Sequence, residues 1–164
     1  KAIMTKEKAI IHPKMKHSKN KIEMIMEALA KVKKNEKTII FTQFHNLVER
    51  IGQEFRKAAV PFLELRGEPS EINYRLNVFR NDPSVEVLLL SIEQAASGIN
   101  LTEANHVFFA HPILGNEYET MVRTYEQCIG RVCRIGQTKP VDAKLFVGEG
   151  TLEANYHNYF MNKK

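Results

Sequence analysis

The run Val85-Glu86-Val87-Leu88-Leu89-Leu90 predicts a strand at the centre of a β-sheet. It is too short for a helix, it is apolar at all but one position, and it follows the turn-forming segment Asn81-Asp82-Pro83. A strand with apolar side chains on both faces must be covered on both faces, which is typical of a parallel sheet.

Further short apolar runs lie on both sides of this strand, and apolar residues recur at helical spacing between them. The other predicted strands are 38–41, 60–65, 106–110 and 143–147, and the predicted helices start at Ser18, run from Leu47 to Ala58, and start again at Ser70. Strands that alternate with helices over short connections imply right-handed crossovers. The predicted fold class is therefore α/β, with three layers: a mostly parallel central sheet and helices on both faces.

The polar and glycine-containing segments follow the predicted strands. In an open parallel sheet, functional groups gather at the carboxyl ends of the strands. Those ends are predicted at 42–44, 66–67, 91–102 and 111–116. We therefore expect the functional site at this edge of the sheet.

Length and composition favour a single domain, and the cysteine content suits a reducing compartment. The 164 residues are 43% hydrophobic and carry a net charge of +5, which suits a polyanionic partner without requiring one. The two cysteines, Cys128 and Cys133, lack metal-ligand spacing, so a disulfide framework or zinc site is not expected. No apolar run approaches the roughly 20 residues of a membrane span.

The chain is expected to divide into three parts. Residues 1–17 are rich in lysine with little apolar periodicity, and they predict a basic lead-in or linker. Residues 18–150 form the predicted domain, and residues 151–164 a C-terminal extension that we expect to be helical. Because the chain begins with Lys1, we expect it to be a piece of a longer protein.

Two arginines are predicted to share one face of a helix. At about 100° per residue, Gln127, Arg131 and Arg134 fall at i, i+4 and i+7, with Gly136 as a left-handed cap and Pro140 preventing continuation. The opposite, apolar face consists of Met121, Tyr125, Cys128, Ile129 and Val132. Paired guanidiniums suit a multiply charged anion such as a nucleotide phosphate. A solvated basic face is the alternative, and the spacing alone does not decide between them.

Five segments, in order, resemble one family. They are Phe41-Thr42-Gln43-Phe44, Arg66-Gly67 with Arg75 and Phe79, Ser91 through Gly98-Ile99-Asn100-Leu101-Thr102, Ala104-Asn105-His106-Val107, and Gln127 through Arg131, Arg134 and Gln137. Together they resemble the C-terminal helicase lobe of Swi/Snf-type ATP-dependent DNA translocases in helicase superfamily 2. This resemblance implies a second RecA-like lobe that closes on ATP and Mg²⁺ held mainly by a first lobe.

The resemblance also implies roles for particular residues. Arg134 would be the arginine finger, Arg131 its companion on the phosphates, and Gln127 would help to order them. Gly98 would approach the nucleotide cleft closely. An arginine finger stabilises the charge of the phosphoryl-transfer transition state. The alternative is that both arginines bind local carboxylates.

Contacts to double-stranded DNA are implied for a second group of residues, namely Thr42, Gln43, Arg66, Asn100 and Thr102. Ordinary turn chemistry is an equal alternative for Asn100, and a strand-end polar pair is nearly as good an interpretation of Thr42 and Gln43. For Arg75, a surface ion pair competes with a structural or DNA-binding role.

The chain departs from the family at several positions. A glycine pair is replaced by Ala95-Ala96, and Glu93 stands where a basic or polar residue is usual. Segment 111–116 replaces a double tryptophan, and Cys133 stands where histidine is usual. The added residues 117–124 are expected either to extend the helix or to form a loop.

The chain contains neither a Gly-x-x-x-x-Gly-Lys-Ser/Thr phosphate loop nor an acidic metal-binding box. We therefore expect it to be part of a DNA-dependent ATPase and to be inactive alone. The predicted partners are the N-terminal lobe of the same protein and double-stranded DNA, with nucleosomes or DNA-bound proteins as substrates, in the nucleus. The alternatives are a degenerate, non-catalytic binding lobe and an RNA helicase lobe.

Overall fold

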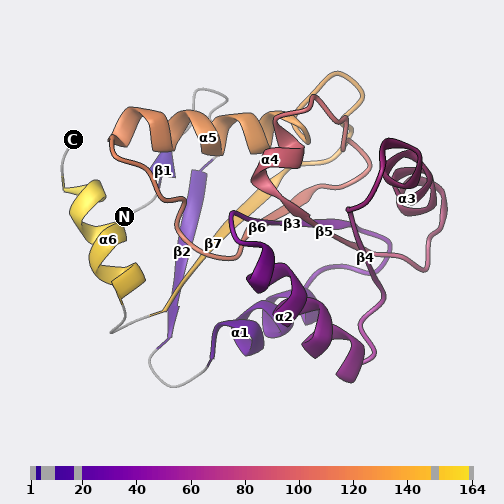
Figure 1. Ribbon diagram of the computed structural model, residues 1–164, viewed down its shortest axis with the longest axis horizontal. Coiled ribbons are helices and arrows are strands. Elements are labelled where there is room, and N and C mark those ends of the chain that lie inside the picture. Colours follow the sequence, from indigo (N-terminus) through magenta and orange to yellow (C-terminus); the bar gives the residue numbers. More distant parts are fainter. Residues whose placement is uncertain (1–2, 5–9, 17–19, 149–151, 163–164) are drawn as a thin grey trace.

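The computed structural model describes residues 3–4, 10–16, 20–148 and 152–162. Within them the strands form one seven-stranded sheet in the order β1-β2-β7-β6-β3-β5-β4. The strands are β1 (Ile3–Met4), β2 (Ile10–Lys16), β3 (Thr38–Thr42), β4 (Phe62–Glu64), β5 (Val87–Ser91), β6 (His106–Phe109) and β7 (Asp142–Gly148). All neighbouring pairs are parallel except β1 and β2. The predicted mostly parallel sheet is confirmed (Figure 1).

Helices cover both faces of this sheet. Helices α1 (Lys21–Ala30) and α2 (His45–Lys57) lie below it in Figure 1, while α4 (Ile92–Ala95) and α5 (Tyr118–Gly130) lie above it. Helix α3 (Pro69–Asn81) sits beside the edge strand β4, and α6 (Leu152–Met161) packs on β7 at the other end. These are the three layers expected of the fold.

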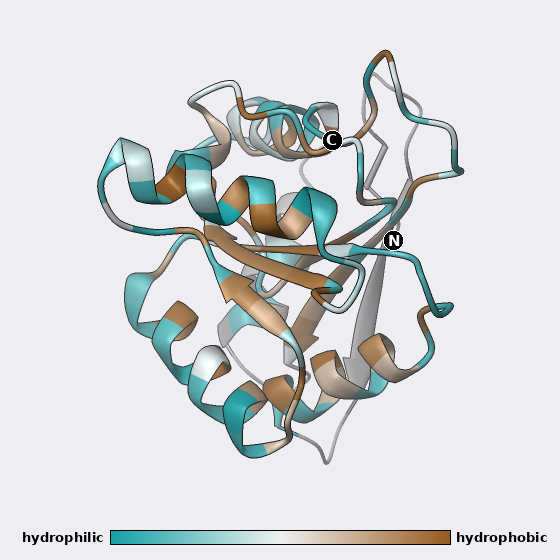
Figure 2. Cartoon of the chain, turned by 90° about the vertical axis from the view of Figure 1, so that its right-hand side faces the viewer, coloured by the Kyte–Doolittle hydropathy of each residue, from teal (hydrophilic) through white to brown (hydrophobic). Residues whose placement is uncertain are grey.

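Two apolar clusters lie on opposite faces because side chains alternate along each strand. On β3, Ile39 and Phe41 point into the cluster under α3, α4 and α5, whereas Ile40 points into the cluster under α1 and α2. Figure 2 shows the sheet as an apolar layer between helices whose outer surfaces are polar. Each fully buried core side chain contributes about 1.5–3 kcal/mol of transfer free energy.

The expectation that residues 1–17 form only a linker is wrong, since they contain β1 and β2. Backbone pairing extends from Ile11 with Ala143 to Lys16 with Gly148. Strand β7 would otherwise be an unpaired sheet edge, so this pairing satisfies its free backbone groups. Helix α1 is capped by Asn20, whose side chain accepts the Glu23 N–H, whereas the expected cap Ser18 lies outside the described residues.

No helix among the described residues is long and apolar enough to cross a membrane.

At the carboxyl edge, His111 joins the ends of β3 and β6. Its Nε2 accepts the Gln43 backbone N–H at 2.9 Å and lies 3.1 Å from Thr42 Oγ1, while Nδ1 lies 2.9 Å from the Pro112 carbonyl. Because Nε2 accepts a backbone N–H, the ring hydrogen belongs on Nδ1, and the imidazole is neutral. Burial lowers the pKa of His111, against a smaller raising effect of the Pro112 carbonyl.

The fold should lose stability as the pH falls below 6.5, the ordinary pKa of histidine. In that range the unfolded chain binds a proton at this ring and the folded chain resists it, so acid favours unfolding, down to the folded-state pKa. Burial also lowers the pKa of His157, which acts in the same direction.

The measurement is thermal unfolding as a function of pH for the wild type and His111→Gln, which keeps one donor and one acceptor. The variant should lose less stability in acid because it has one fewer group to protonate. An equal acid loss in both proteins would contradict a role for His111.

Candidate functional site

Helix α5 ends before the two arginines, so the expectation that they lie on the helix is wrong. The helix spans Tyr118–Gly130, Arg131 is its C-terminal cap, and Arg134 follows in a turn. Gly130 has low helix propensity. The Arg131 carbonyl accepts the N–H of Leu101 at 2.8 Å instead of an N–H further along the helix. The added residues 117–124 form the first turns of α5 rather than a loop.

Residues 131–137 form a compact segment that we call the arginine turn. The Gln137 N–H donates to the Arg134 carbonyl at 3.0 Å, and Gly136 between them has a φ of +105°. A β-turn with a positive φ at its third residue favours glycine. Gly136 therefore closes this turn instead of capping α5. The turn places Arg134 and Ile135 at the surface.

The arginine turn is tied to the 95–104 loop, which runs from the end of α4 toward β6. Arg131 Nε donates to the Ala95 carbonyl at 2.6 Å, and Arg134 Nη1 makes a longer contact of 3.5 Å with the Gly98 carbonyl. Gln137 Nε2 lies within 3.2 Å of the carbonyls of Thr102, Ala104 and Val132. Each guanidinium thus commits few of its five N–H donors.

An open hollow of about 480 Å³ lies beside the arginine turn. It is lined by Arg123, Glu126, Gln127, Gly130, Arg131, Cys133 and Arg134. Three of the predicted nucleotide-binding residues, Gln127, Arg131 and Arg134, therefore meet at one place, and Gly98 is linked to them through Arg134. Among the described residues, no carboxylate lies within ion-pair distance of Arg131 or Arg134.

Cys128, next to Gln127 in sequence, is buried in the apolar core. Burial raises the pKa of its thiol to about 12, and the nearby Arg131 only partly offsets this. A thiol with such a pKa stays protonated and unreactive at neutral pH. Cys128 is therefore a core residue of α5.

Gly98 and Asn100 shape the 95–104 loop. Gly98 has a φ of +86°, and no atom lies within 4 Å of the position that a Cβ would take. Glycine is therefore favoured here by the backbone conformation and not by lack of space. Asn100 Oδ1 accepts the Thr102 N–H at 3.2 Å, which is a local turn made by an exposed side chain. Asn100 is exposed, and Thr102 is half-buried.

Two of the residues expected to contact DNA make hydrogen bonds that hold the fold. Thr42 is fully buried, and its hydroxyl accepts the Phe44 N–H and faces His111. The Gln43 side-chain amide bonds both the N–H and the carbonyl of Leu114, at 2.7 and 3.2 Å. The DNA assignment of Thr42 is therefore corrected, because its side chain does not reach the surface.

Arg66 and Arg75 lie where β4 ends. Arg66 is about half exposed and sits 3.8 Å from Glu64, whereas Arg75 donates to the Glu64 carbonyl at 2.9 Å. Arg75 therefore braces α3 against β4, and Arg66 remains available at the surface.

Sequence reasoning did not assign roles to His111, Arg80 or Gln137. Arg80 donates to the Asn100 carbonyl and lies 3.4 Å from Glu103, so it braces the 95–104 loop from α3. For Gln137, the sequence signal was a polar residue at the end of the arginine motif.

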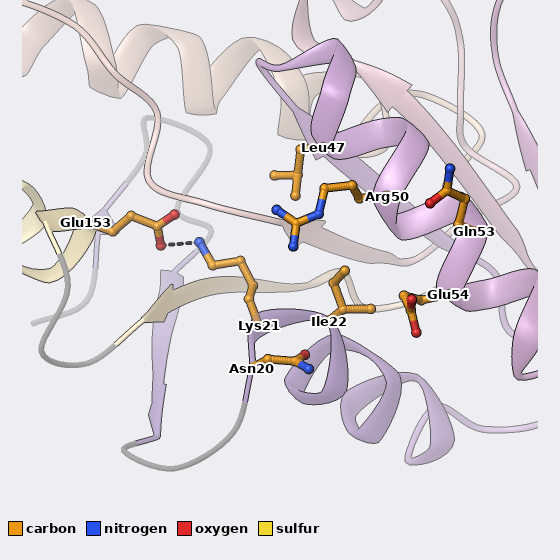
Figure 3. A pocket seen from close by; sticks show the side chains of 8 residues that line it. All are labelled: Asn20, Lys21, Ile22, Leu47, Arg50, Gln53, Glu54 and Glu153. Carbon is orange, nitrogen blue, oxygen red and sulfur yellow. Dashed lines mark hydrogen bonds and ion pairs between the residues drawn. The ribbon is translucent and has the colours of Figure 1, made fainter.

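A second hollow, of about 390 Å³, lies between α1, α2 and α6 (Figure 3). In it Lys21 is paired with Glu153, and Arg50 points toward the same space, with Glu54 nearby. None of the site residues predicted from the sequence lines this hollow. Its opposite charges largely neutralise one another.

Comparison with known proteins identifies the family. Residues 20–136 match the helicase conserved C-terminal domain. The human E3 ubiquitin-protein ligase SHPRH is 30% identical over 158 residues, covering 92% of this chain and 9% of that protein. The DNA repair protein rad8 of Schizosaccharomyces pombe is 34% identical over 120 residues, covering 72% of this chain and 10% of that protein. The chain thus spans about a tenth of the length of these relatives.

Solved structures agree with this assignment. The C-terminal part of the Fun30 ATPase domain superposes with a TM-score of 0.75 at 23% identity, covering 86% of this chain and 45% of that one. The SWI2/SNF2 ATPase core domain of Sulfolobus solfataricus gives a TM-score of 0.59 at 30% identity, covering 87% of this chain and 27% of that one. The chain therefore belongs to the helicase conserved C-terminal domain family, as a RecA-like lobe of the Swi2/Snf2 type.

Proposed function

We propose that this lobe is the second motor lobe of an ATP-dependent double-stranded DNA translocase. In this role it closes on ATP held mainly by a first lobe and presents Arg134 and Arg131 to the phosphates. The observation that carries the proposal is the pair of arginines beside the hollow, held by backbone carbonyls and free of described carboxylate partners.

The donor set fits a triphosphate. Positive charge at the equatorial oxygens stabilises the phosphoryl-transfer transition state, and a planar guanidinium can donate two hydrogen bonds to one phosphate. Arg131 is oriented by its Ala95 contact, while the weaker contact of Arg134 lets it turn toward an incoming phosphate. Gln127 lies on the same wall as a neutral donor.

Mg²⁺ would neutralise phosphate charge when bound, and it would be held mainly outside this lobe. Among the described residues that line the hollow, Glu126 is the one carboxylate, whereas Mg²⁺ sites commonly combine carboxylates with phosphate oxygens. The lobe's own residues therefore act on the phosphates rather than on the metal.

The proposed DNA contacts are Arg66, Asn100, Thr102 and Gln43. Arg66 and Gln43 follow strands β4 and β3 at the carboxyl edge, and Asn100 and Thr102 belong to the 95–104 loop. Short polar side chains and an arginine suit phosphate oxygens, which carry no sequence information. Affinity should therefore depend strongly on salt and little on sequence.

The Ala95-Ala96 substitution is compatible with a working motor, because the Ala95 contact to Arg131 uses the backbone carbonyl. This supports the motor over a degenerate binding lobe. The relative rad8, named as a DNA repair protein, supports a role in DNA repair or chromatin remodelling and a nuclear location, with nucleosomes or DNA-bound proteins as substrates.

Arg134→Ala in the full-length protein should lower duplex-stimulated ATP turnover by about 10³-fold or more, because the transition state loses its guanidinium. Duplex binding should survive. Arg134→Lys should recover little activity, since an ammonium cannot replace the planar fork.

Arg56→Ala is the matched control, an exposed arginine on α2 that packs over the Phe62 ring on the other side of the sheet. It should keep wild-type turnover. Unchanged turnover in Arg134→Ala would show that the arginine turn is structural and that the proposal is wrong.

Arg66→Ala should weaken duplex binding equally for unrelated sequences and reduce the slope of log affinity against log salt by about one. The measurement is a salt titration of duplex affinity with the full-length protein. Lys57→Ala, which removes an exposed cation of α2, should leave the slope unchanged. An unchanged slope in Arg66→Ala would remove Arg66 from the DNA interface.

A further inference from the structure

Gln137 makes the densest set of polar contacts in the arginine turn. Its Nε2 lies 2.7 Å from the Ala104 carbonyl, 3.0 Å from the Val132 carbonyl and 3.2 Å from the Thr102 carbonyl. Its Oε1 accepts the Lys139 N–H at 3.0 Å. This pattern fixes the orientation of the amide, because the opposite orientation would point an oxygen at three carbonyls.

These contacts join two segments with different proposed partners. Thr102 and Ala104 belong to the 95–104 loop, which carries the proposed DNA contacts Asn100 and Thr102. Val132 belongs to the arginine turn. The loop is also braced from its other side, where Arg80 of α3 reaches the Asn100 carbonyl and Glu103. The loop is thus held between α3 on one side and the arginine turn on the other.

The other links between loop and turn differ from Gln137 in one respect. Arg131 and Arg134 bond the loop through their guanidiniums, which are also the groups proposed to bind the nucleotide phosphates. When an arginine turns toward a phosphate, its hold on the loop weakens. The contacts of Gln137 and the backbone bond from Leu101 to Arg131 do not involve those guanidiniums, and of these two links only Gln137 uses a side chain.

We propose that Gln137 is a positioning residue that couples duplex DNA on the 95–104 loop to the placement of Arg131 and Arg134, and so lets DNA stimulate ATP hydrolysis. This inference rests on the proposed motor function. It assigns Gln137 no contact with either DNA or nucleotide. Misplacing a catalytic group by about 1 Å can cost about 10²-fold in rate, so a small shift of the turn is sufficient.

The test is the ratio of ATP turnover at saturating duplex to turnover without DNA, measured in the full-length protein. Gln137→Met keeps the side-chain length and removes both donors, and it should lower the ratio by about 10-fold or more. Gln137→Glu, which points a carboxylate at the three carbonyls, should lower it as well. A variant that only reduces the folded fraction lowers both rates together and leaves the ratio unchanged.

Thr138→Ala is the matched control, since Thr138 is the exposed neighbour of Gln137. It should keep the wild-type ratio. A wild-type ratio in both Gln137 variants, with Arg134→Ala inactive, would overturn this inference and leave the motor function standing. A ratio that falls only because duplex affinity is lost would also overturn it. Full turnover in Arg134→Ala would instead overturn the proposed function itself.

Discussion

The strands from β4 to β7 run in the same direction, and the site depends on this constraint. A sheet buried on both faces has only its ends and the loops beyond them for function. Gln43, Arg66 and His111 follow strand ends at the carboxyl edge, and the 95–104 loop leads from α4, after β5, back to the start of β6. The arginine turn lies between α5 and the start of β7, and it meets the 95–104 loop because α5 stops at Gly130 and the following residues bond that loop. The fold thereby brings together segments far apart in the sequence.

Backbone carbonyls, not carboxylates, hold the two arginines of the turn. Carbonyls of Ala95 and Gly98 accept from Arg131 and Arg134, and no described carboxylate neutralises them. A partner carboxylate would compete with a phosphate, whereas a carbonyl orients the guanidinium and leaves its charge available. The apolar face of α5 is buried, which keeps the supporting helix fixed. On this face the Tyr125 hydroxyl oxygen accepts the Ile113 N–H at 2.9 Å.

Much of the fold could be predicted because it depends on local patterns. The run at Val85 and the β-branched run at Thr38 both form strands within two residues of the predicted bounds. The end of α5 could not be predicted, because it depends on Leu101 and Gln137, which meet the helix only in the folded chain. For the same reason the pairing of β2 with β7 and the burial of Thr42 were missed. The meeting of Gln127, Arg131 and Arg134 at one hollow was expected, while their chemical roles stay predictions.

The central claim is that this lobe stabilises a transition state formed on a nucleotide held elsewhere. The most direct measurement compares the affinities of the full-length protein for ADP and for ADP with aluminium fluoride, which mimics the transferring phosphoryl group. Arg134→Ala should weaken binding of the mimic by about 10³-fold and leave ADP binding unchanged, because the finger acts only on the transition state. Equal affinities for the mimic in wild type and variant would contradict the account.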